Sequence, residues 1–377
     1  MHIGITTRFN YGFFSNGLYQ NIILLYEILE SAGHDVFFID FCGNQEESII
    51  KTDIEQSFLN NKNIVSYDEL SPIKHHLDVV CTPGIACNPE HAEKYKSVNS
   101  ECKIAAINYG NVLVTDICNY ICSEENHGGW ASEPSSLIHD AVLYSPHYDF
   151  CEDYLKINTS PNTFELPYIW DPKFIYGSAE VLDIQEKDLK YNIKEKNNIA
   201  IVEPNMNFSK TFIPPLFTVK HLLAHYPDIF GKAIFFGTLK LINDEKDQLR
   251  SRILNDRVFR DHIKRMIFDP RQAMPKIMSK DNPIFLSHQH LNALNYTYLE
   301  AAYFGYPLVH NSEFIKEFGY YYENFNMIEA AEQLKLATEE HNDNLDIKLE
   351  QGKELCWKYS PKNSDNIKKT SQLFENI

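Results

Sequence analysis

One carboxylate in the second half of the chain is placed where it could serve a ligand. Glu300 lies in the run TYLEAAYF, among apolar and aromatic neighbours, and the run ends at Gly305. A helical glutamate that only faces solvent is the alternative, but acidic residues are seldom set among so many apolar ones without a partner. An apolar strand pattern precedes the run at 283–289, and the N-terminus of a helix after a strand offers free N–H groups to a pyrophosphate. The sequence therefore predicts an anion site beside a carboxylate.

The elements that must position this site alternate between strand and helix patterns. In the first half, the apolar run HIGIT is followed by a helical stretch that ends at Gly33 and by the strand pattern DVFFID. Such βαβ units with nearly unbroken apolar strands are typical of a parallel sheet covered on both faces. Further strand candidates lie at 77–83, 103–108, 141–145 and 162–169.

The second half repeats the pattern after a polar, charged stretch between 171 and 198. Its strand patterns are NIAIVEP, KAIFFGT, RMIFDPR, PIFLSHQ and YPLVHN. We therefore expect an α/β protein with two Rossmann-like domains, whose ligands lie at the carboxyl ends of the strands. The predicted parts are a first domain at 1–170, a connection at 171–198, a second domain at 199–345 and a C-terminal helix at 346–377 that crosses back to the first domain.

The run NYTYLEAAYFGYPLVHN resembles the C-terminal signature of GT-B glycosyltransferases, in which Glu, Ala and then Gly-x-Pro surround the helix that holds a nucleoside diphosphate. The resemblance implies two Rossmann-like domains whose parallel sheets face each other across a cleft. It also implies that Glu300 accepts hydrogen bonds from ribose hydroxyls. Many members of this superfamily carry a second Glu eight residues earlier, where this chain has Asn292. An amide can bond a sugar hydroxyl but cannot act as a base.

Several further stretches are similar to one family in particular. They resemble a bacterial and phage family of unassigned function that has a GT-B pattern. The stretches are NGLYQNI, VEPN followed by SKT, SHQ, GYYY and the run described above. The resemblance implies a nucleotide-sugar site made of Gly17, Glu203, Asn205, Lys210, Arg271, His288, Asn292, Asn295 and Glu300. The match also covers Asn16, Gln20, Asn108, Gly110, Asp116, His147, His310 and Asn311.

Two of these residues are cations suited to a departing diphosphate. A pyrophosphate leaving group gains negative charge, so positive groups must lie near it, and GT-B enzymes commonly use Lys or Arg where metal-dependent folds use a metal ion. Lys210 lies in a Ser-Lys-Thr turn ahead of a helix pattern, and Arg271 ends RMIFDPR. A surface ion pair is the alternative for each. We accordingly expect no cofactor and no metal, with the nucleoside diphosphate sugar as co-substrate.

Two residues of the first half are candidates to act on an acceptor hydroxyl. Asp116 and His147 both follow predicted strands closely, and an inverting transfer needs a base within hydrogen-bond reach of that hydroxyl. The alternative for His147 is a histidine that only serves the structure. The loop 123–134, which contains Trp130, suits a flap over the acceptor, with a plain surface loop as the alternative.

Other patterns limit the function classes. Cys118 and Cys122 are one helical turn apart, but no His or Cys pair with metal spacing accompanies them. The eight cysteines are scattered, as in a reduced protein. No G-x-G-x-x-G follows the first strand, and no P-loop or G-x-S-x-G elbow occurs, which argues against dinucleotide enzymes and the common hydrolases. Without an apolar run of about 18 residues or a signal-peptide pattern, we expect a cytoplasmic protein with no membrane span.

The charge of the chain is unevenly distributed. A formal net charge of −17 argues against a surface that binds nucleic acid throughout. Between 250 and 271, however, seven Lys and Arg stand against three Asp. This stretch is either a solvated helix face with ion pairs or a local patch that binds anions.

The leading hypothesis is a hexosyl- or pentosyltransferase that moves a sugar from a nucleoside diphosphate sugar, with uridine expected, to a hydroxyl of a surface glycan or a similar acceptor held by the first domain. A close alternative is a phage DNA glycosyltransferase acting on 5-hydroxymethylcytosine, a base that must be flipped out of a duplex. A third hypothesis, of another class, is a non-catalytic nucleotide- or sugar-binding module, suggested by Asn292.

Overall fold

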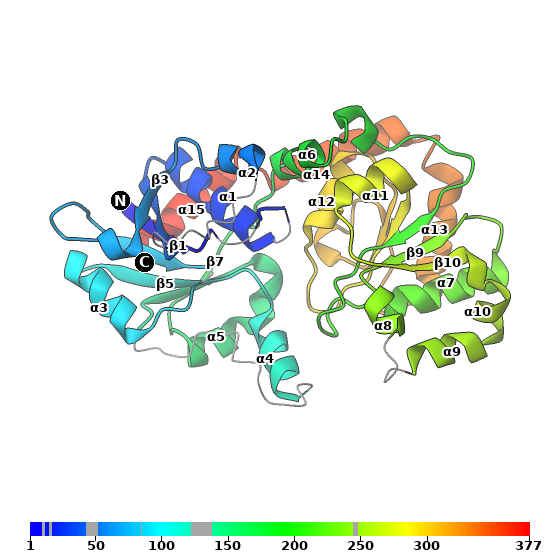
Figure 1. Cartoon of the computed structure of the whole chain (residues 1–377), viewed down its shortest axis with the longest axis horizontal. Coiled ribbons are helices and arrows are strands. Elements are labelled where there is room, and N and C mark those ends of the chain that lie inside the picture. The colour runs from blue at the N-terminus through cyan, green and yellow to red at the C-terminus, as the bar shows by residue number, and fades with distance from the viewer. Residues whose placement is uncertain (10–11, 15–16, 43–51, 84, 122–137, 244–247) are drawn as a thin grey trace. The chain divides into compact units, whose positions relative to one another are not determined.

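The computed structural model of the chain describes residues 1–9, 12–14, 17–42, 52–83, 85–121, 138–243 and 248–377. The chain forms two compact units, each built around its own parallel sheet (Figure 1). The first unit combines Met1–Gly177 with the C-terminal segment Trp357–Ile377, and the second unit is Ser178–Cys356. The predicted α/β class with two Rossmann-like sheets is confirmed.

The first unit is organised around a sheet of seven parallel strands in the order β3-β2-β1-β4-β5-β6-β7. Its central strands are buried along their length, as apolar strands of a sheet covered on both faces must be. The strands are β1 (His2–Thr7), β2 (Asp35–Asp40), β3 (Asn63–Ser66), β4 (Val79–Thr82), β5 (Lys103–Asn108), β6 (Ala141–Tyr144) and β7 (Thr163–Glu165).

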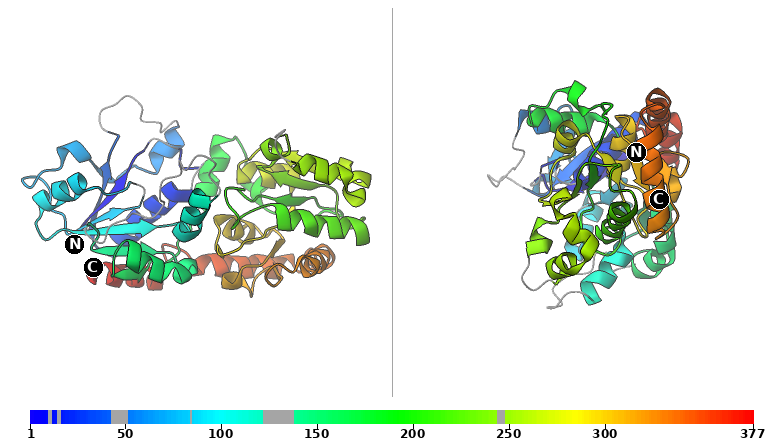
Figure 2. Two further views of the ribbon diagram at one scale, coloured as in Figure 1. Left: turned by 90° about the horizontal axis from the view of Figure 1, so that it is seen from below. Right: turned by 90° about the vertical axis from the view of Figure 1, so that its right-hand side faces the viewer.

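Helices cover both faces of this sheet (Figure 2). On one face, α1 and the C-terminal α15 pack together over alternate residues of the central strands, such as Ile3 and Ile5. On the other face, Tyr95 of α3 packs with Ile104 of β5. The helices of this unit are α1 (Gly17–Ser31), α2 (Asp53–Ser57), α3 (Pro89–Val98), α4 (Val112–Ile121), α5 (Glu152–Asn158), α6 (Lys173–Val181), which runs into the second unit, and α15 (Ser364–Glu375).

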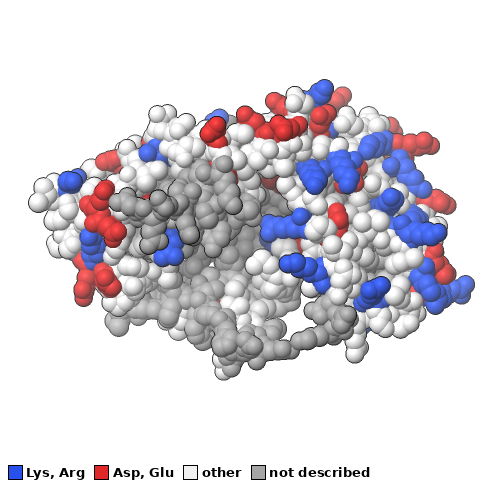
Figure 3. Space-filling model, in the orientation of Figure 1, with Lys and Arg blue, Asp and Glu red and all other residues white. Residues whose placement is uncertain are grey.

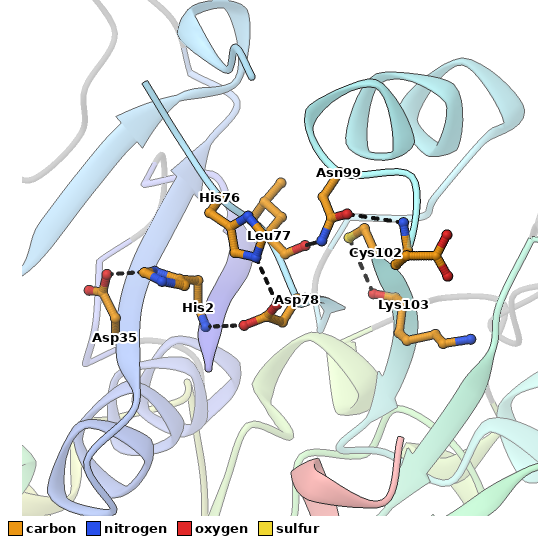
Figure 4. A network of polar contacts seen from close by, with 9 residues as sticks. His2, Asp35, His76, Leu77, Asp78, Asn99, Cys102 and Lys103 are labelled. Carbon is orange, nitrogen blue, oxygen red and sulfur yellow. Dashed lines mark hydrogen bonds and ion pairs between the residues drawn. The ribbon is translucent and has the colours of Figure 1, made fainter. Parts of the chain in front are cut away.

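A polar network ties together the amino ends of the first sheet (Figure 4). The backbone N–H of His2 donates to Asp78 Oδ2 at 2.7 Å, and the His2 ring bonds Asp35 Oδ2 at 2.8 Å. His76 bonds the second oxygen of Asp78 at 3.0 Å. Burial alone would raise the pKa of Asp78, but these donors hold it below its ordinary value. The network fixes where β1 starts relative to β2 and β4.

The second unit contains a sheet of six parallel strands in the order β10-β9-β8-β11-β12-β13. The chain leaves β8 toward β9 and β10, and then returns to place β11 on the other side of β8. This reversal is the topological switch point at which open α/β sheets bind ligands. The strands are β8 (Ile199–Ile201), β9 (Ala233–Phe236), β10 (Met266–Asp269), β11 (Ile284–Leu286), β12 (Leu308–His310) and β13 (Tyr320–Tyr321).

The helices of the second unit position the loops at this switch point. α7 and α13 pack with each other and with the sheet through residues such as Leu216 and Leu334. α12 lies against α14 so closely that a Cβ on Gly352 would stand 2.1 Å from the carbonyl oxygen of Ala302. The helices are α7 (Ile213–His225), α8 (Leu239–Asn243), α9 (Leu249–Asn255), α10 (Arg257–Asp261), α11 (Met274–Asp281), α12 (Tyr296–Tyr303), α13 (Met327–Glu340) and α14 (Leu345–Lys358).

The segments that join the units differ in detail from the expected boundaries. The stretch expected as a connection, 171–198, contains α6, and the units divide inside this helix at Gly177. The expected C-terminal helix is two helices, of which α15 packs against α1 in the first unit. In the described part of the chain, no helix is both long and apolar enough to cross a membrane.

Candidate functional site

Two loops meet at the switch point of the second sheet. Glu203 follows β8 and is buried, with 2% of its surface exposed. Ser287, the first residue after β11, donates its hydroxyl to Glu203 Oε1, and the backbone N–H of His288 donates to the same oxygen at 3.1 Å. The Ser287 hydroxyl also bonds the hydroxyl of Tyr298 on α12 at 3.0 Å. One carboxylate thus connects β8, β11 and α12.

The loop after β8 is folded by Asn205. Its backbone is left-handed, with φ of 56°, a conformation that Asn tolerates better than most residues. Its side chain donates to the carbonyl of Glu203 at 2.8 Å and accepts from the N–H of Phe212 at 2.8 Å, and its N–H donates to the carbonyl of Lys210 at 3.1 Å. Asn205 therefore closes the loop and sets the place of Lys210.

Burial brings the pKa values of Glu203 and Lys210 close together. It raises the pKa of Glu203 to about 7, against the opposing effects of the Ser287 hydroxyl, Lys210 and the His288 N–H. It lowers the pKa of Lys210 to about 8, and the carboxylate of Glu203 opposes this shift. Lys210 is half-buried and forms no ion pair with a described residue at 4.0 Å or less. An anionic ligand would restore its full positive charge.

Glu300 lies on α12, as expected from the sequence. Asn295 caps this helix, because its side chain accepts from the N–H of Thr297 at 3.2 Å. Glu300 is half-buried, and its carboxylate makes no hydrogen bond or ion pair with any described residue. Burial raises its pKa to about 7. A half-buried carboxylate without donors is unusual in a folded protein, since such groups are normally hydrogen-bonded.

The loop after β11 is held by the residue that follows the neighbouring strand β12. The side chain of Asn311, after β12, accepts from the N–H of Gln289 at 2.9 Å and donates to its carbonyl at 2.8 Å. The side chain of Gln289 in turn accepts from the N–H of Asn292 at 2.8 Å. These hydrogen bonds fix the backbone conformation between His288 and Asn292.

The structure brings five of the predicted residues into one connected region of the second unit, namely Glu203, Asn205, Lys210, His288 and Asn292. Asn295 and Glu300 belong to the adjoining α12. Arg271 is exposed after β10, with β9 between its strand and β8. The partners Ser287, Tyr298 and Tyr322 were not predicted, and the only signal for them was the polar end of the strand pattern PIFLSHQ.

The remaining residues proposed for the site lie in the first unit. Gly17 is the first residue of α1. Asp116, on α4, is buried and accepts a hydrogen bond from the Tyr154 hydroxyl at 2.7 Å. His147, after β6, is buried between the rings of Tyr148 and Tyr168. Asn16, Cys122 and the proposed acceptor flap 123–134 with Trp130 lie outside the described residues.

The arginines of the basic stretch at 250–271 make different kinds of contact. Arg265 donates to the backbone carbonyls of Pro227, Phe230 and Gly231, so it supports the fold. Arg257 pairs with Asp261 at 3.6 Å on the surface. No group of three or more His, Cys, Asp or Glu that could hold a metal occurs among the residues that the structure describes.

The chain matches one protein family over nearly its whole length. The sequence profile of a family described as "protein of unknown function (DUF2827)" matches residues 3–374. No curated protein matches the chain in sequence.

Several solved structures are similar to the chain in fold. An α-glucosyltransferase in complex with UDP has 13% identity and a TM-score of 0.60, with 100% of both chains covered. An α-glucosyltransferase with UDP and a 13-mer DNA containing an HMU base has 11% identity and a TM-score of 0.59, with 100% of this chain and 99% of the other covered. A DNA-modifying β-glucosyltransferase has 12% identity and a TM-score of 0.50, with 100% and 99% covered. These likenesses show the GT-B fold.

Proposed function

The chain belongs to the DUF2827 family and has the GT-B fold, and from this premise we propose that it transfers a sugar from a uridine diphosphate sugar to a hydroxyl group. The structurally similar α-glucosyltransferases are described in complex with UDP. We assign the donor to the carboxyl edge of the second sheet, at the switch point between β8 and β11.

The carboxylate of Glu300, which has no hydrogen-bond or ion-pair partner among the described residues, is the observation that carries this proposal. Vicinal ribose hydroxyls are two donors that would satisfy both of its oxygens, and they would favour its charged form against the effect of burial. Because Glu300 lies on α12, the positive dipole end of the same helix, which Asn295 caps, would face the diphosphate. Ribose and phosphate would then lie along one helix.

Lys210 is proposed to balance the charge of the departing diphosphate. The loop after β8 that Asn205 closes presents it at the switch point. A half-buried ammonium stabilises a developing negative charge more than an exposed one, because less water screens it. In this proposal the protein's own cations take the place of a metal ion, and Arg271 contributes from the end of β10.

The acceptor would be activated in the first unit. Its hydroxyl oxygen attacks the anomeric carbon, the bond from that carbon to the phosphate oxygen breaks, and the UDP takes the bonding electrons. The hydroxyl proton passes to a base, for which Asp116 and His147 are the candidates. Asp116 is a carboxylate on α4 that accepts a hydrogen bond from the Tyr154 hydroxyl at 2.7 Å, and His147 is a buried imidazole after β6.

A DNA acceptor is a second candidate because of the charge on the second unit. Lys and Arg gather over the part of this unit that carries α8 to α11 (Figure 3). Residues 232–280 hold twelve Lys and Arg against six Asp and Glu, in a chain with a net charge of −17. A duplex backbone is the kind of polyanion that such a face attracts. Among the described residues of this range, the exposed cations are Lys232, Lys240, Arg250, Arg252, Arg257, Arg260, Lys264, Arg271, Lys276 and Lys280.

Donor hydrolysis tests the catalytic proposal. Incubation with UDP-glucose, UDP-galactose and UDP-N-acetylglucosamine should release UDP slowly from at least one of them, because water replaces a missing acceptor. UDP binding without release from any donor would favour a non-catalytic binding module instead.

Mass spectrometry distinguishes a DNA acceptor from a glycan acceptor. A duplex containing 5-hydroxymethylcytosine is incubated with the protein and each donor, and the nucleosides are then weighed. A nucleoside heavier by one sugar residue establishes the DNA acceptor, whereas an unshifted mass with a donor that the protein hydrolyses leaves the glycan acceptor.

A further inference from the structure

His288 is a buried histidine whose two ring nitrogens have different surroundings. The residue is 1% exposed. Its Nδ1 lies 3.0 Å from the hydroxyl of Tyr322, and this hydroxyl donates to the carbonyl of Ser287 at 2.9 Å. Its Nε2 is buried and has no hydrogen-bond partner among the described residues. One end of the ring is therefore fixed and the other is unused.

The contacts of Tyr322 determine the tautomer of His288. A neutral tyrosine has one hydroxyl hydrogen, and here it is directed to the carbonyl of Ser287. The nitrogen that faces the same hydroxyl must then donate, so the proton of a neutral ring is on Nδ1. Burial, and to a smaller extent His290, lowers the pKa of His288 to about 4, so the ring is neutral near pH 7. Nε2 consequently presents a bare lone pair.

A buried acceptor without a donor destabilises a fold by about 1–3 kcal/mol and calls for an explanation. The ring of Phe325, whose centroid lies 4.5 Å from that of His288, is 49% exposed. Because Nε2 is buried, a ligand can reach it only if a neighbouring side chain moves, and the half-exposed Phe325 ring is the contact of His288 least held by the core. Its movement would open Nε2 to a ligand at the switch point.

We propose that Nε2 of His288 accepts a hydrogen bond from a hydroxyl of the sugar carried by the donor nucleotide, and so selects which sugar is transferred. This inference rests on the proposed function. The diphosphate has no donor to offer at neutral pH, and the ribose hydroxyls are assigned to Glu300. Hydroxyls of the sugar are the remaining donors close to the phosphate end of the nucleotide, where Lys210 lies. The face of the Phe325 ring suits the C–H face of a sugar.

Binding of UDP and of UDP-sugars to two variants tests the proposal. His288→Phe keeps the ring and removes the acceptor, and His288→Gln places an amide oxygen near the position of Nε2. His225→Phe, on the exposed end of α7, is the matched control. Calorimetry with UDP, UDP-glucose, UDP-galactose and UDP-N-acetylglucosamine measures affinity, and thermal unfolding verifies that each variant is folded.

We expect His288→Phe to bind its best UDP-sugar about 5- to 100-fold more weakly than the wild type does, which corresponds to one buried hydrogen bond. Its affinity for UDP should stay within twofold, and His288→Gln should recover part of the loss. An equal loss of affinity for UDP and for the UDP-sugar would show that His288 contacts the nucleotide and not the sugar. Unchanged affinity for both would show that His288 does not contact the ligand. Both results overturn the proposal while leaving the donor site standing.

If His288→Phe fails to fold, modified ligands test the proposal instead. Monodeoxy analogues of the best UDP-sugar are titrated into the wild type and into Tyr322→Phe, which frees Nδ1 and lets the proton move to Nε2. One analogue should lose affinity in the wild type and lose less in Tyr322→Phe. Equal losses for every analogue in both proteins would contradict the role of His288. Failure of the wild type to bind UDP at all would instead overturn the proposed function.

Discussion

The hydroxyl of Ser287 donates a hydrogen bond to the buried carboxylate of Glu203, although the two residues are 84 positions apart in the chain. This contact joins the loops after β8 and β11 at the point where the strand order of the second sheet reverses. Glu203 therefore holds together the two loops that carry Lys210 and His288. Its protonation state connects the stability of the second unit to pH.

Glu203→Gln should reduce the dependence of stability on pH. Burial raises the pKa of Glu203 to about 7 in the folded protein, so its contribution to stability is full below its ordinary value near 4.5 and is lost as pH rises through 7. The wild-type melting temperature should thus fall between pH 5 and 8, and that of Glu203→Gln should fall less. The exposed control Glu317→Gln should follow the wild type. Parallel curves for Glu203→Gln and the wild type would show that Glu203 does not titrate in this range.

Affinity for a UDP-sugar should pass through a maximum near pH 7–8. Burial raises the pKa of Glu300 to about 7, so the carboxylate that accepts ribose hydroxyls gains its charge as pH rises. Burial lowers the pKa of Lys210 to about 8, so the cation beside the phosphates loses its charge above that pH. Calorimetry with UDP-glucose from pH 6 to 9 measures the profile. Glu300→Gln should flatten its acid side and Lys210→Gln its alkaline side, and a profile unchanged in both would refute the two assignments.

Asp116→Asn should slow transfer without weakening the binding of UDP. The amide still accepts a hydrogen bond from Tyr154, so the fold of α4 is kept, but it cannot take a proton. Loss of a general base reduces turnover by roughly 10²–10⁴-fold. UDP affinity should be unchanged because the donor site is assigned to the second unit. Turnover within twofold of the wild type would show that Asp116 is not the base. Tyr154→Phe removes only the hydrogen bond to Asp116, so it should reduce turnover less than Asp116→Asn does.

Gly352→Ala should destabilise the second unit. A Cβ on this residue of α14 would stand 2.1 Å from the carbonyl oxygen of Ala302 on α12, and backbone cannot yield as a flexible side chain does. Overpacking of this kind costs about 1–3 kcal/mol. Thermal unfolding should show a lower melting temperature, and UDP affinity should fall too, since α12 carries Glu300. Gly110→Ala is the control, because a Cβ there meets nothing within 4 Å. Equal melting temperatures for both variants would contradict the close packing.

The alternation of apolar strands and helices was enough to predict both sheets, because parallel strands buried on both faces give continuous apolar runs. β3 and β13 were missed. β3 is an edge strand exposed for half its length, and β13 has only two residues, so neither produces an apolar run. The polar stretch at 171–198 hid α6, whose apolar residues were read as part of a connection.

The structure brings most of the proposed residues of the second unit close together, but their contacts could not be predicted from the sequence. Glu300 and Lys210 were proposed from local patterns and from the family resemblance. The structure adds that Glu300 has no partner among the described residues and that Asn205 closes the loop of Lys210. The links of Glu203 to Ser287 and of His288 to Tyr322 could not be predicted, because they depend on which strands become neighbours. Asn295 was expected at the ligand, and the structure uses its side-chain oxygen to cap α12.

The most direct measurement is the binding of UDP to the wild type and to Glu300→Ala by calorimetry, with 2′,3′-dideoxy-UDP as the second ligand. The loss of ribose hydrogen bonds of about 1–3 kcal/mol should weaken UDP binding roughly 5- to 150-fold in Glu300→Ala. The dideoxy ligand, which lacks the hydroxyls, should bind both proteins equally. If folded Glu300→Ala binds UDP as tightly as the wild type does, Glu300 does not hold the ribose, and the donor site is not where we place it.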